Sequence, residues 1–248
     1  MKPPRSKFYR YMSWLILGIA LLGFGPSFIL RPFIEQPANQ PPLDAWVFVH
    51  ATIGFLWVFI FIAQTSLVQT NRVHLHKKLG WTAVGLATML VVSIIIAALN
   101  RPYRLLEAGW ARDQLAEGAL DLATVVVLDI GGAFYFGSLF LMGILTRNDI
   151  IKHRAFMLYA GITVVFQAFV RIGENFFGTE LGLVAGAIIA LIVILLPLMY
   201  EFFKFRKPKK ITIGIFAYLI LAQITFQIVG QLPGVIDFVW EVVDSLNQ

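Results

Sequence analysis

The stretch TELGLVAGAIIALIVILLPLMYEFF at residues 179–203 decides the fold class. Its only charged residues are Glu180 and Glu201, close to its two ends. A helix rises about 1.5 Å per residue, so about 20 apolar residues cross the roughly 30 Å hydrocarbon core of a bilayer. We therefore interpret this stretch as a membrane-spanning helix.

Six more stretches of the same kind occur along the chain. They cover approximately residues 12–30, 44–69, 79–99, 121–146, 154–173 and 211–231. The chain has 248 residues, 58% of them hydrophobic and 14% charged, whereas soluble domains are about 45–50% apolar. Seven spans leave no room for a sizeable soluble domain. The sequence predicts one all-α membrane domain over residues 1–248, with seven transmembrane helices.

Basic residues concentrate in alternate loops. They occur at Lys2, Arg5, Lys7 and Arg10, and in the turns at 70–78, 147–154 and 204–210, whereas the loops at 31–44 and 100–121 and the C-terminal tail are acidic or mixed. The positive-inside rule then predicts a bacterial inner-membrane protein with a cytoplasmic N-terminus and a periplasmic C-terminus. No small-x-small cleavage site follows the first apolar run, so we expect it to be retained as a span.

The distribution of charge excludes a nucleic-acid partner and indicates lipid instead. The net charge is +6, but the cations sit in short turns rather than on one folded face. Such turns attract anionic lipid headgroups. The 100–121 loop and the C-terminal tail each combine apolar and charged residues at helical spacing, which predicts two short interfacial helices.

Several chemistries lack their residues. The chain has no cysteine, which rules out disulfides, thiolate metal sites, iron–sulfur clusters and a cysteine nucleophile. It has no Walker loop, no nucleotide-binding glycine fingerprint, no His-Glu-x-x-His and no Gly-x-Ser-x-Gly. We predict no catalytic residue and no metal site from these motifs, and an enzyme is not favoured.

Polar residues inside the spans are the candidate ligand-binding residues. On insertion scales, burying such a residue in hydrocarbon costs roughly several kcal/mol unless it finds a partner. They recur at helical spacing in the half of the bundle away from the basic turns. The set is His50, Asp129, Gln167, Arg171, Glu174, Gln223 and Gln227.

We expect these stripes to enclose a polar cavity in the outer half of the membrane. Asp129 and Arg171 are the expected charge partners in it. The alternative is structural: glutamines in spans often only join helices, and Arg171 would then extend to the interface.

A second constellation lies at the basic turns. His76 and His153 each precede a glycine-bearing helix, and together they could ligate a metal or a haem iron, since neutral imidazole is a ligand for both. The alternative is that both belong to turns that only contact headgroups.

A resemblance accompanies these residues. The segments RVHLHKKLGW at 72–81 and RNDIIKHRAFM at 147–157, with His50 near the start of the second span and Arg171 ending the fifth, resemble uncharacterised bacterial polytopic membrane proteins of unknown function. Some of those families have distant similarity to b-type cytochrome membrane domains. The resemblance covers spans two to five and implies that His50, His76, His153 and Arg171 matter. A two-haem carrier needs four histidines inside the membrane, and only His50 lies well inside.

Three functional hypotheses remain. The first is a transporter-like or accessory protein whose outer cavity binds a small polar or amphipathic ligand, an ion or a lipid. The second is a redox protein that binds one b-type haem or a quinone, with His50, or His76 and His153, as cofactor ligands. The third is a structural subunit of a membrane complex, with a partner subunit or further copies of this chain.

Overall fold

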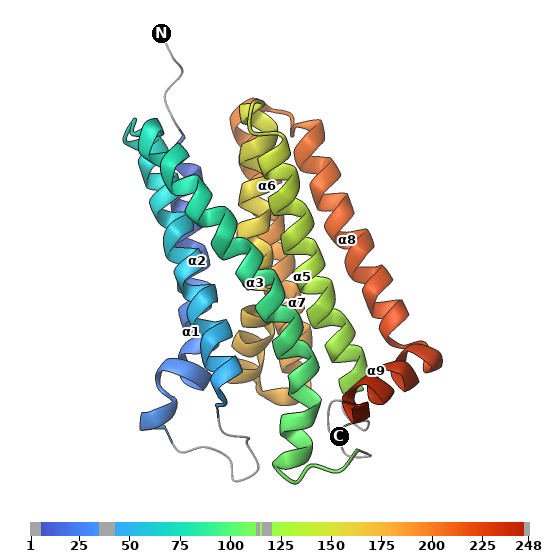
Figure 1. The fold of residues 1–248 in the computed structure, drawn as a ribbon. Helices are drawn as coiled ribbons and strands as arrows, with labels where there is room; N and C mark the ends of the chain where they lie inside the picture. The colour runs from blue at the N-terminus through green and yellow to red at the C-terminus, as the bar shows by residue number, and fades with distance from the viewer. Residues whose placement is uncertain (1–5, 35–42, 113–114, 116–120, 246–248) are drawn as a thin grey trace.

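The computed structural model describes residues 6–34, 43–112, 115 and 121–245, apart from the side chains of residues 179 and 180. These residues form helices joined by short turns. The helices are α1 (Phe8–Phe24), α2 (Ala45–Gln69), α3 (Val73–Glu107), α5 (Leu122–Leu145), α6 (Ile150–Thr163), α7 (Phe166–Phe205), α8 (Lys210–Gly230) and α9 (Pro233–Ser245), with short π and 3₁₀ turns at Gly25–Ile29 and Arg31–Phe33 (Figure 1).

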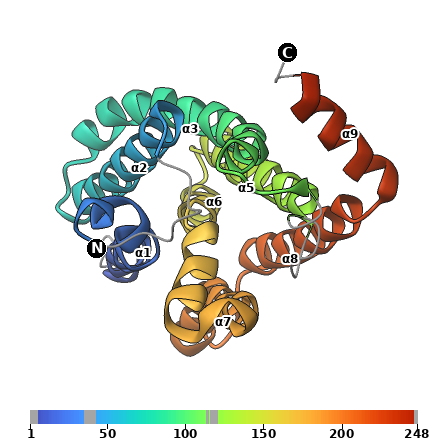
Figure 2. The ribbon, with the colours of Figure 1, turned by 90° about the horizontal axis from the view of Figure 1, so that it is seen from below.

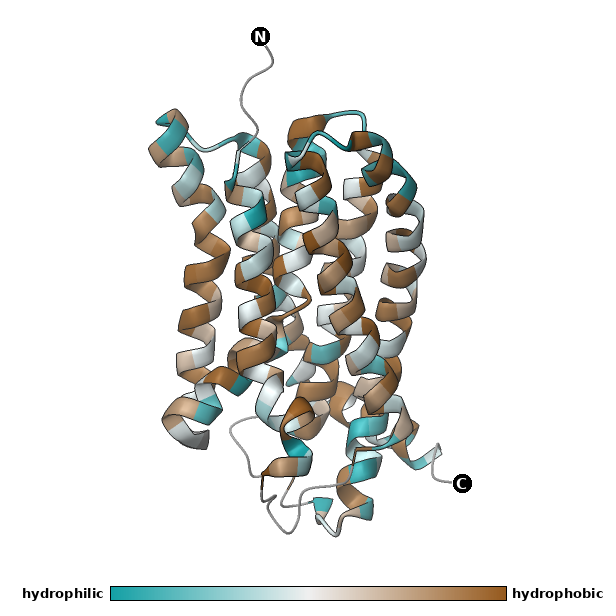
Figure 3. Cartoon of the chain, turned by 90° about the vertical axis from the view of Figure 1, so that its left-hand side faces the viewer, coloured by the Kyte–Doolittle hydropathy of each residue, from teal (hydrophilic) through white to brown (hydrophobic). Residues whose placement is uncertain are grey.

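The prediction of an all-α fold is confirmed, and the described helices are compatible with a membrane protein. Six of the described helices are long and apolar enough to cross a membrane, or seven if a bent pair counts as one span. Apolar residues dominate the middle of the bundle, and polar residues gather toward its ends (Figure 3). Large apolar side chains such as Trp14, Phe59 and Leu221 are exposed, as expected of a surface that faces lipid.

Helix α6 runs through the centre of the bundle, with the other long helices around it (Figure 2). Its residues Leu158 to Thr163 are all buried. Trp57 of α2 stacks on Phe61, with 5.4 Å between ring centroids, and meets Phe136 of α5 edge-on at 5.0 Å. A second, smaller cluster forms where Val239 and Val243 of α9 pack against the ends of α3 and α5.

Aspartates begin three of the helices. Asp44, Asp121 and Asp149 precede α2, α5 and α6, and each carboxylate accepts a hydrogen bond from a backbone N–H of the first turn. These N–H groups have no partner within the helix, so an aspartate cap fixes the residue at which the helix starts. At Asp149 the backbone N–H of Lys152 is the main cause that lowers the carboxyl pKa.

The predicted fifth span is broken rather than continuous. Helix α6 ends at Thr163, and the first part of α7 continues after a bend of 40°. At Gly178 the backbone has φ 77° and the chain reverses, after which α7 returns to Phe205. The predicted spans 154–173 and 179–203 thus correspond to α6 plus a tight helical hairpin.

Glycines allow the two arms of this hairpin to touch. A Cβ atom on Gly182 would lie 2.6 Å from the Cα atom of Glu174, and one on Gly173 would lie 1.9 Å from the carbonyl oxygen of Gly182. Any larger residue would force the two backbones apart.

Two further differences concern the ends of spans. Helix α3 continues past residue 99 to Glu107, because Pro102 is accommodated inside the helix rather than ending it. The first part of the expected 100–121 interfacial helix is therefore the last turns of α3, and residues 113–114 and 116–120 lie outside the described residues. The C-terminal tail is helical as expected, over Pro233–Ser245.

The turns that carry the basic residues lie together at one end of the bundle, which we call the basic end. Helix α1 begins there, and α9 lies at the opposite end (Figure 1). This arrangement agrees with an odd number of crossings.

We expect Gly182→Ala to destabilise the protein by about 1–3 kcal/mol, since an overpacked contact must be relieved by backbone shifts. Gly214→Ala in α8 is the matched control, because a Cβ atom there meets nothing within 4 Å. Thermal denaturation in a neutral detergent compares the two. Equal melting temperatures for both variants would contradict the close approach of the hairpin arms.

The charge of the loops predicts the orientation. Alkaline phosphatase fused after Ser245 should be active in a bacterial host, and green fluorescent protein fused there should stay dark, because the positive-inside rule keeps the basic end in the cytoplasm. The same reporters fused at the α7–α8 turn should give the reverse pattern. A fluorescent C-terminal fusion would show that the orientation is wrong.

Candidate functional site

Asp129 is the centre of a polar cluster between three helices. It lies on α5 seven residues after Leu122, which is about 10 Å along the helix. Its side chain is 13% exposed, and its Oδ2 atom is 3.5 Å from Nη1 of Arg101 on α3. The side-chain amide of Gln167 on α7 donates a hydrogen bond to Oδ1. We call Asp129, Arg101, Gln167 and Arg171 the Asp129 cluster.

The break between α6 and α7 determines where Gln167 lies. α7 begins at Phe166, so Gln167 belongs to its first turn. The carboxylate that receives its hydrogen bond is thus held beside a helix N-terminus, where the backbone dipoles favour negative charge. Helices broken within the membrane expose such ends at the binding sites of transporters.

Arg171 follows one turn after Gln167. Its Cζ atom lies 5.8 Å from the ring centroid of Phe24 on α1, and the charges of Arg101, Glu174 and Asp129 all act on it. In the part of the chain that the structure describes, the ion pair of Asp129 is with Arg101, not with Arg171. The expected Asp129–Arg171 pair is therefore replaced by a pair to a residue that the sequence pattern did not single out.

The sequence contained a partial signal for Arg101. The sequence pattern predicts a loop at Arg101, because Pro102 and the charges after it normally mark a helix end. Since α3 continues as a helix to Glu107, Arg101 stays on the bundle and faces α5. Arg101 lies two residues after the predicted span 79–99, and its side chain is long enough to reach a carboxylate about 10 Å inside the next span.

The last turns of α3 also bind a second aspartate, which caps α2. Oδ2 of Asp44, the cap of α2, lies 2.9 Å from Nε of Arg104 and accepts a hydrogen bond of 2.9 Å from Nδ2 of Asn100. The charges of Arg31 and Arg101 also act on Arg104. The end of α3 is thus bound to α2 through one carboxylate and to α5 through another.

The other expected ligand-binding residues are distributed over different helix pairs. Nδ1 of His50 lies 3.0 Å from Oγ of Ser93, which joins α2 to α3. The hydroxyl of Tyr135 donates to Oε1 of Gln223 at 3.3 Å, which joins α5 to α8. Gln227 is half-buried on α8, one turn after Gln223, and Glu174 is exposed on α7. Of the seven, the structure brings together Asp129, Gln167 and Arg171.

At the basic end the structure brings two histidines together. The ring centroids of His76, in the first turn of α3, and His153, in the first turn of α6, are 6.2 Å apart, with their planes at 82°. Nδ1 of His153 lies 2.8 Å from the carbonyl oxygen of Gly143. His74, two residues before His76, is exposed.

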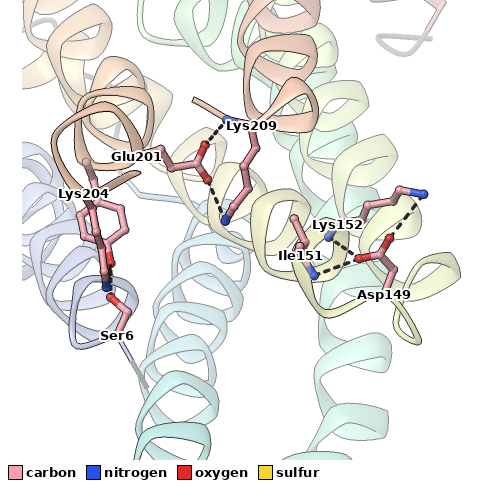
Figure 4. A network of polar contacts seen from close by, with 8 residues as sticks. Ser6, Asp149, Ile151, Lys152, Glu201, Lys204 and Lys209 are labelled. Carbon is pink, nitrogen blue, oxygen red and sulfur yellow. Dashed lines mark hydrogen bonds and ion pairs between the residues drawn. The ribbon is translucent and has the colours of Figure 1, made fainter. Parts of the chain in front are cut away.

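A recess of about 450 Å³ also opens at the basic end. It is lined by Asp149, Ile151, Lys152, Lys207, Pro208, Lys209, Lys210 and Ile211. Beside it, the buried carboxylate of Glu201 accepts a hydrogen bond of 2.8 Å from the backbone N–H of Lys209 and lies 3.3 Å from its Nζ atom, while Asp149 pairs with Lys152 (Figure 4). The lysines outnumber the carboxylates here, so contact with anionic headgroups stays a prediction for this face.

We expect Asp129→Asn and Arg101→Gln to be coupled. Each single change leaves a charge without its partner. The double variant should therefore lose about 0.5–1.5 kcal/mol less unfolding free energy than the sum of the two single losses. The partial exposure of Arg101 keeps this coupling small. Thermal or denaturant unfolding of the four proteins measures the coupling. The control cycle combines Asp129→Asn with Arg112→Gln, whose ion pair is with Asp244; it should be additive. A coupled control and an additive Asp129–Arg101 cycle would contradict the pairing.

Comparison with known proteins identifies no relative. No family model matches the chain, and no curated protein or solved structure matches it either. The resemblance to uncharacterised polytopic membrane proteins therefore stays an expectation, and a function has to be argued from the geometry of the two polar sites.

Proposed function

We propose that this multi-pass membrane protein binds a small anionic amphiphile, with a carboxylate or phosphate head and an apolar body, at the Asp129 cluster. The protein would act as a transporter-like or accessory binding protein. The observation that carries the proposal is a carboxylate on α5 that is held by α3 and by the first turn of α7, directly after the break between α6 and α7.

The cost of Asp129 supports a functional role. An ionisable side chain inside a span is disfavoured by about 2.5–3.5 kcal/mol on insertion scales, and such residues are retained mainly where they serve a ligand or ion pathway. A serine or alanine would pack between α3, α5 and α7 without this cost. The carboxylate orients Arg101 and Gln167, whose remaining hydrogen-bond donors are then fixed in direction.

The arginines beside Asp129 support an anion rather than a cation. Arg101 of α3 and Arg171 of α7 both act on the carboxylate of Asp129 and on each other. Arginine binds carboxylate and phosphate through its fork of donors, so these two side chains suit an anionic head.

The apolar body of the ligand fits the surroundings of Arg171. The guanidinium lies over the half-buried ring of Phe24 on α1. A ligand whose head reaches the arginines would therefore lay its chain among α1 and α7 side chains. If the cluster only joined helices, the protein would not prefer an anionic ligand over a cationic one.

Decanoate and decyltrimethylammonium, equal in chain length and opposite in charge, are suitable probes. Decanoate should raise the melting temperature of the protein in a neutral maltoside detergent by about 5–10 °C at a hundredfold excess over its dissociation constant, since binding to the native state alone stabilises it by about 2.7 kcal/mol. Arg101→Gln and Arg171→Gln should each abolish most of the shift, and the ammonium probe should give none.

Arg112→Gln is the matched control, because Arg112 lies at the same end but pairs with Asp244 and stacks on Trp240. It should keep the full response to decanoate. The proposal fails if both probes shift the melting temperature equally, if decanoate has no effect, or if its effect survives in Arg101→Gln and Arg171→Gln alike. The last result would leave the cluster with a structural role.

A further inference from the structure

We infer that His76 and His153 together hold one transition-metal ion, either bare or as the iron of a haem, between the first turns of α3 and α6. This site lies at the basic end, distinct from the Asp129 cluster, and does not depend on the function proposed for that cluster. The shared chemistry is a metal bound by two neutral imidazoles.

The separation of the rings fits one metal ion. With metal–nitrogen bonds of about 2.0–2.1 Å, and a ring centre roughly 1.1 Å behind each ligating nitrogen, two imidazoles on one ion have centres at most about 6.4 Å apart. The observed distance is 6.2 Å. The separation therefore fits one ion between a nitrogen of each ring, and rings at 82° do not obstruct one another in a near-linear arrangement.

The hydrogen bond of His153 to the backbone determines which of its ring nitrogens carries the proton. Nδ1 lies 2.8 Å from the carbonyl oxygen of Gly143. A carbonyl oxygen only accepts hydrogen bonds, so Nδ1 carries the proton and donates it. In a neutral imidazole Nε2 then has the free lone pair. Metal-binding histidines are held in this way, with the second ring nitrogen donating to a backbone carbonyl or a carboxylate.

His76 has a ring nitrogen that lacks a partner. Within the described residues, Nδ1 of His76 is buried and makes no hydrogen bond. A buried polar atom without a partner costs free energy. A metal ion would satisfy it.

A second buried atom without a partner among the described residues lies on Gln64 of α2. Oε1 of Gln64 is buried and unpaired among the described residues, and the amide nitrogen of the same side chain lies 4.0 Å from the place of a Cβ atom on Gly80. Gly80 is one turn after His76 on α3. The amide of Gln64 is therefore directed at the helix that carries His76, where its oxygen can complete the coordination of a bare ion or hydrogen-bond to a ligand of the metal.

Protein side chains alone do not saturate the ion. In the described part of the chain no three His, Cys, Asp or Glu residues come together as a metal site. Two imidazoles therefore require further donors, which are either water and the Gln64 amide or the four nitrogens of a porphyrin. Imidazole is a good ligand for zinc, copper, nickel and iron, so the two sources of metal are distinguished by experiment.

The consequence for the fold is a link between two helical hairpins. His76 begins the returning helix of the α2–α3 hairpin, and His153 begins the returning helix of the α5–α6 hairpin. A metal ion between them would join both hairpins at the basic end, opposite to the place where Arg101 and Asp129 join α3 to α5.

The test uses the full chain, purified in detergent without a polyhistidine tag and with its metals removed by a chelator. Zinc and cupric ions are titrated by calorimetry, and haemin by its Soret band. We expect one equivalent of either an ion or haemin to bind, with the affinity reduced about tenfold or more in His76→Ala and in His153→Ala. Binding of haemin alone would assign the site to a haem, and binding of an ion alone to a bare metal.

His74→Ala is the matched control, since it removes an exposed histidine from the same turn, and it should bind as the wild type does. His153→Asn keeps a donor for Gly143 and replaces His153→Ala if that variant does not fold. X-ray absorption of the loaded wild type gives a readout without any variant and should show two imidazoles on the metal. The inference is wrong if nothing binds, if His74→Ala loses as much affinity as His76→Ala, or if the metal has fewer than two imidazole ligands.

Discussion

Hydrocarbon offers no hydrogen bonds, and this constraint governs both the backbone and the polar side chains of the protein. The backbone satisfies it by forming helices whose N–H and C=O groups pair internally. Polar side chains satisfy it by pairing across helices: Asp129 with Gln167 and Arg101, His50 with Ser93, Tyr135 with Gln223. Each such contact joins two helices, so the requirement to pair polar atoms also determines which helices are neighbours.

At the broken span the backbone cannot satisfy this constraint by a regular helix alone. A bend of 40° between α6 and α7 interrupts the regular helix, and in the hairpin that follows the two arms of α7 pack against each other at glycines. Irregular backbone is tolerated at membrane depth only where protein or a water-lined space covers it. The position of the Asp129 cluster beside this break is the reason for assigning it a ligand rather than a packing role.

The two ends of the bundle differ in chemistry. The basic end combines lysines, the buried Glu201 and two imidazoles that lie close together, and among the described residues Nδ1 of His76 has no hydrogen-bond partner. The opposite end combines arginines and aspartates between helix termini. α3 connects the two, with His76 in its first turn and Arg101 and Arg104 near its last.

The sequence alone determined the class of the protein, because the length and hydropathy of a span depend only on residues that are close in the chain. The same holds for the identification of Asp129, Gln167, His76 and His153 as residues of interest. Their partners could not be read in this way. Arg101 was not identified, because Pro102 usually ends a helix. In the structure α3 continues through Pro102 and packs against α2 and α5. The break at Val164, the contact of Gly173 with Gly182 and the distance between His76 and His153 depend on how helices cross. Only the tertiary structure decides these, because the free energy of each contact comes from residues far apart in the chain.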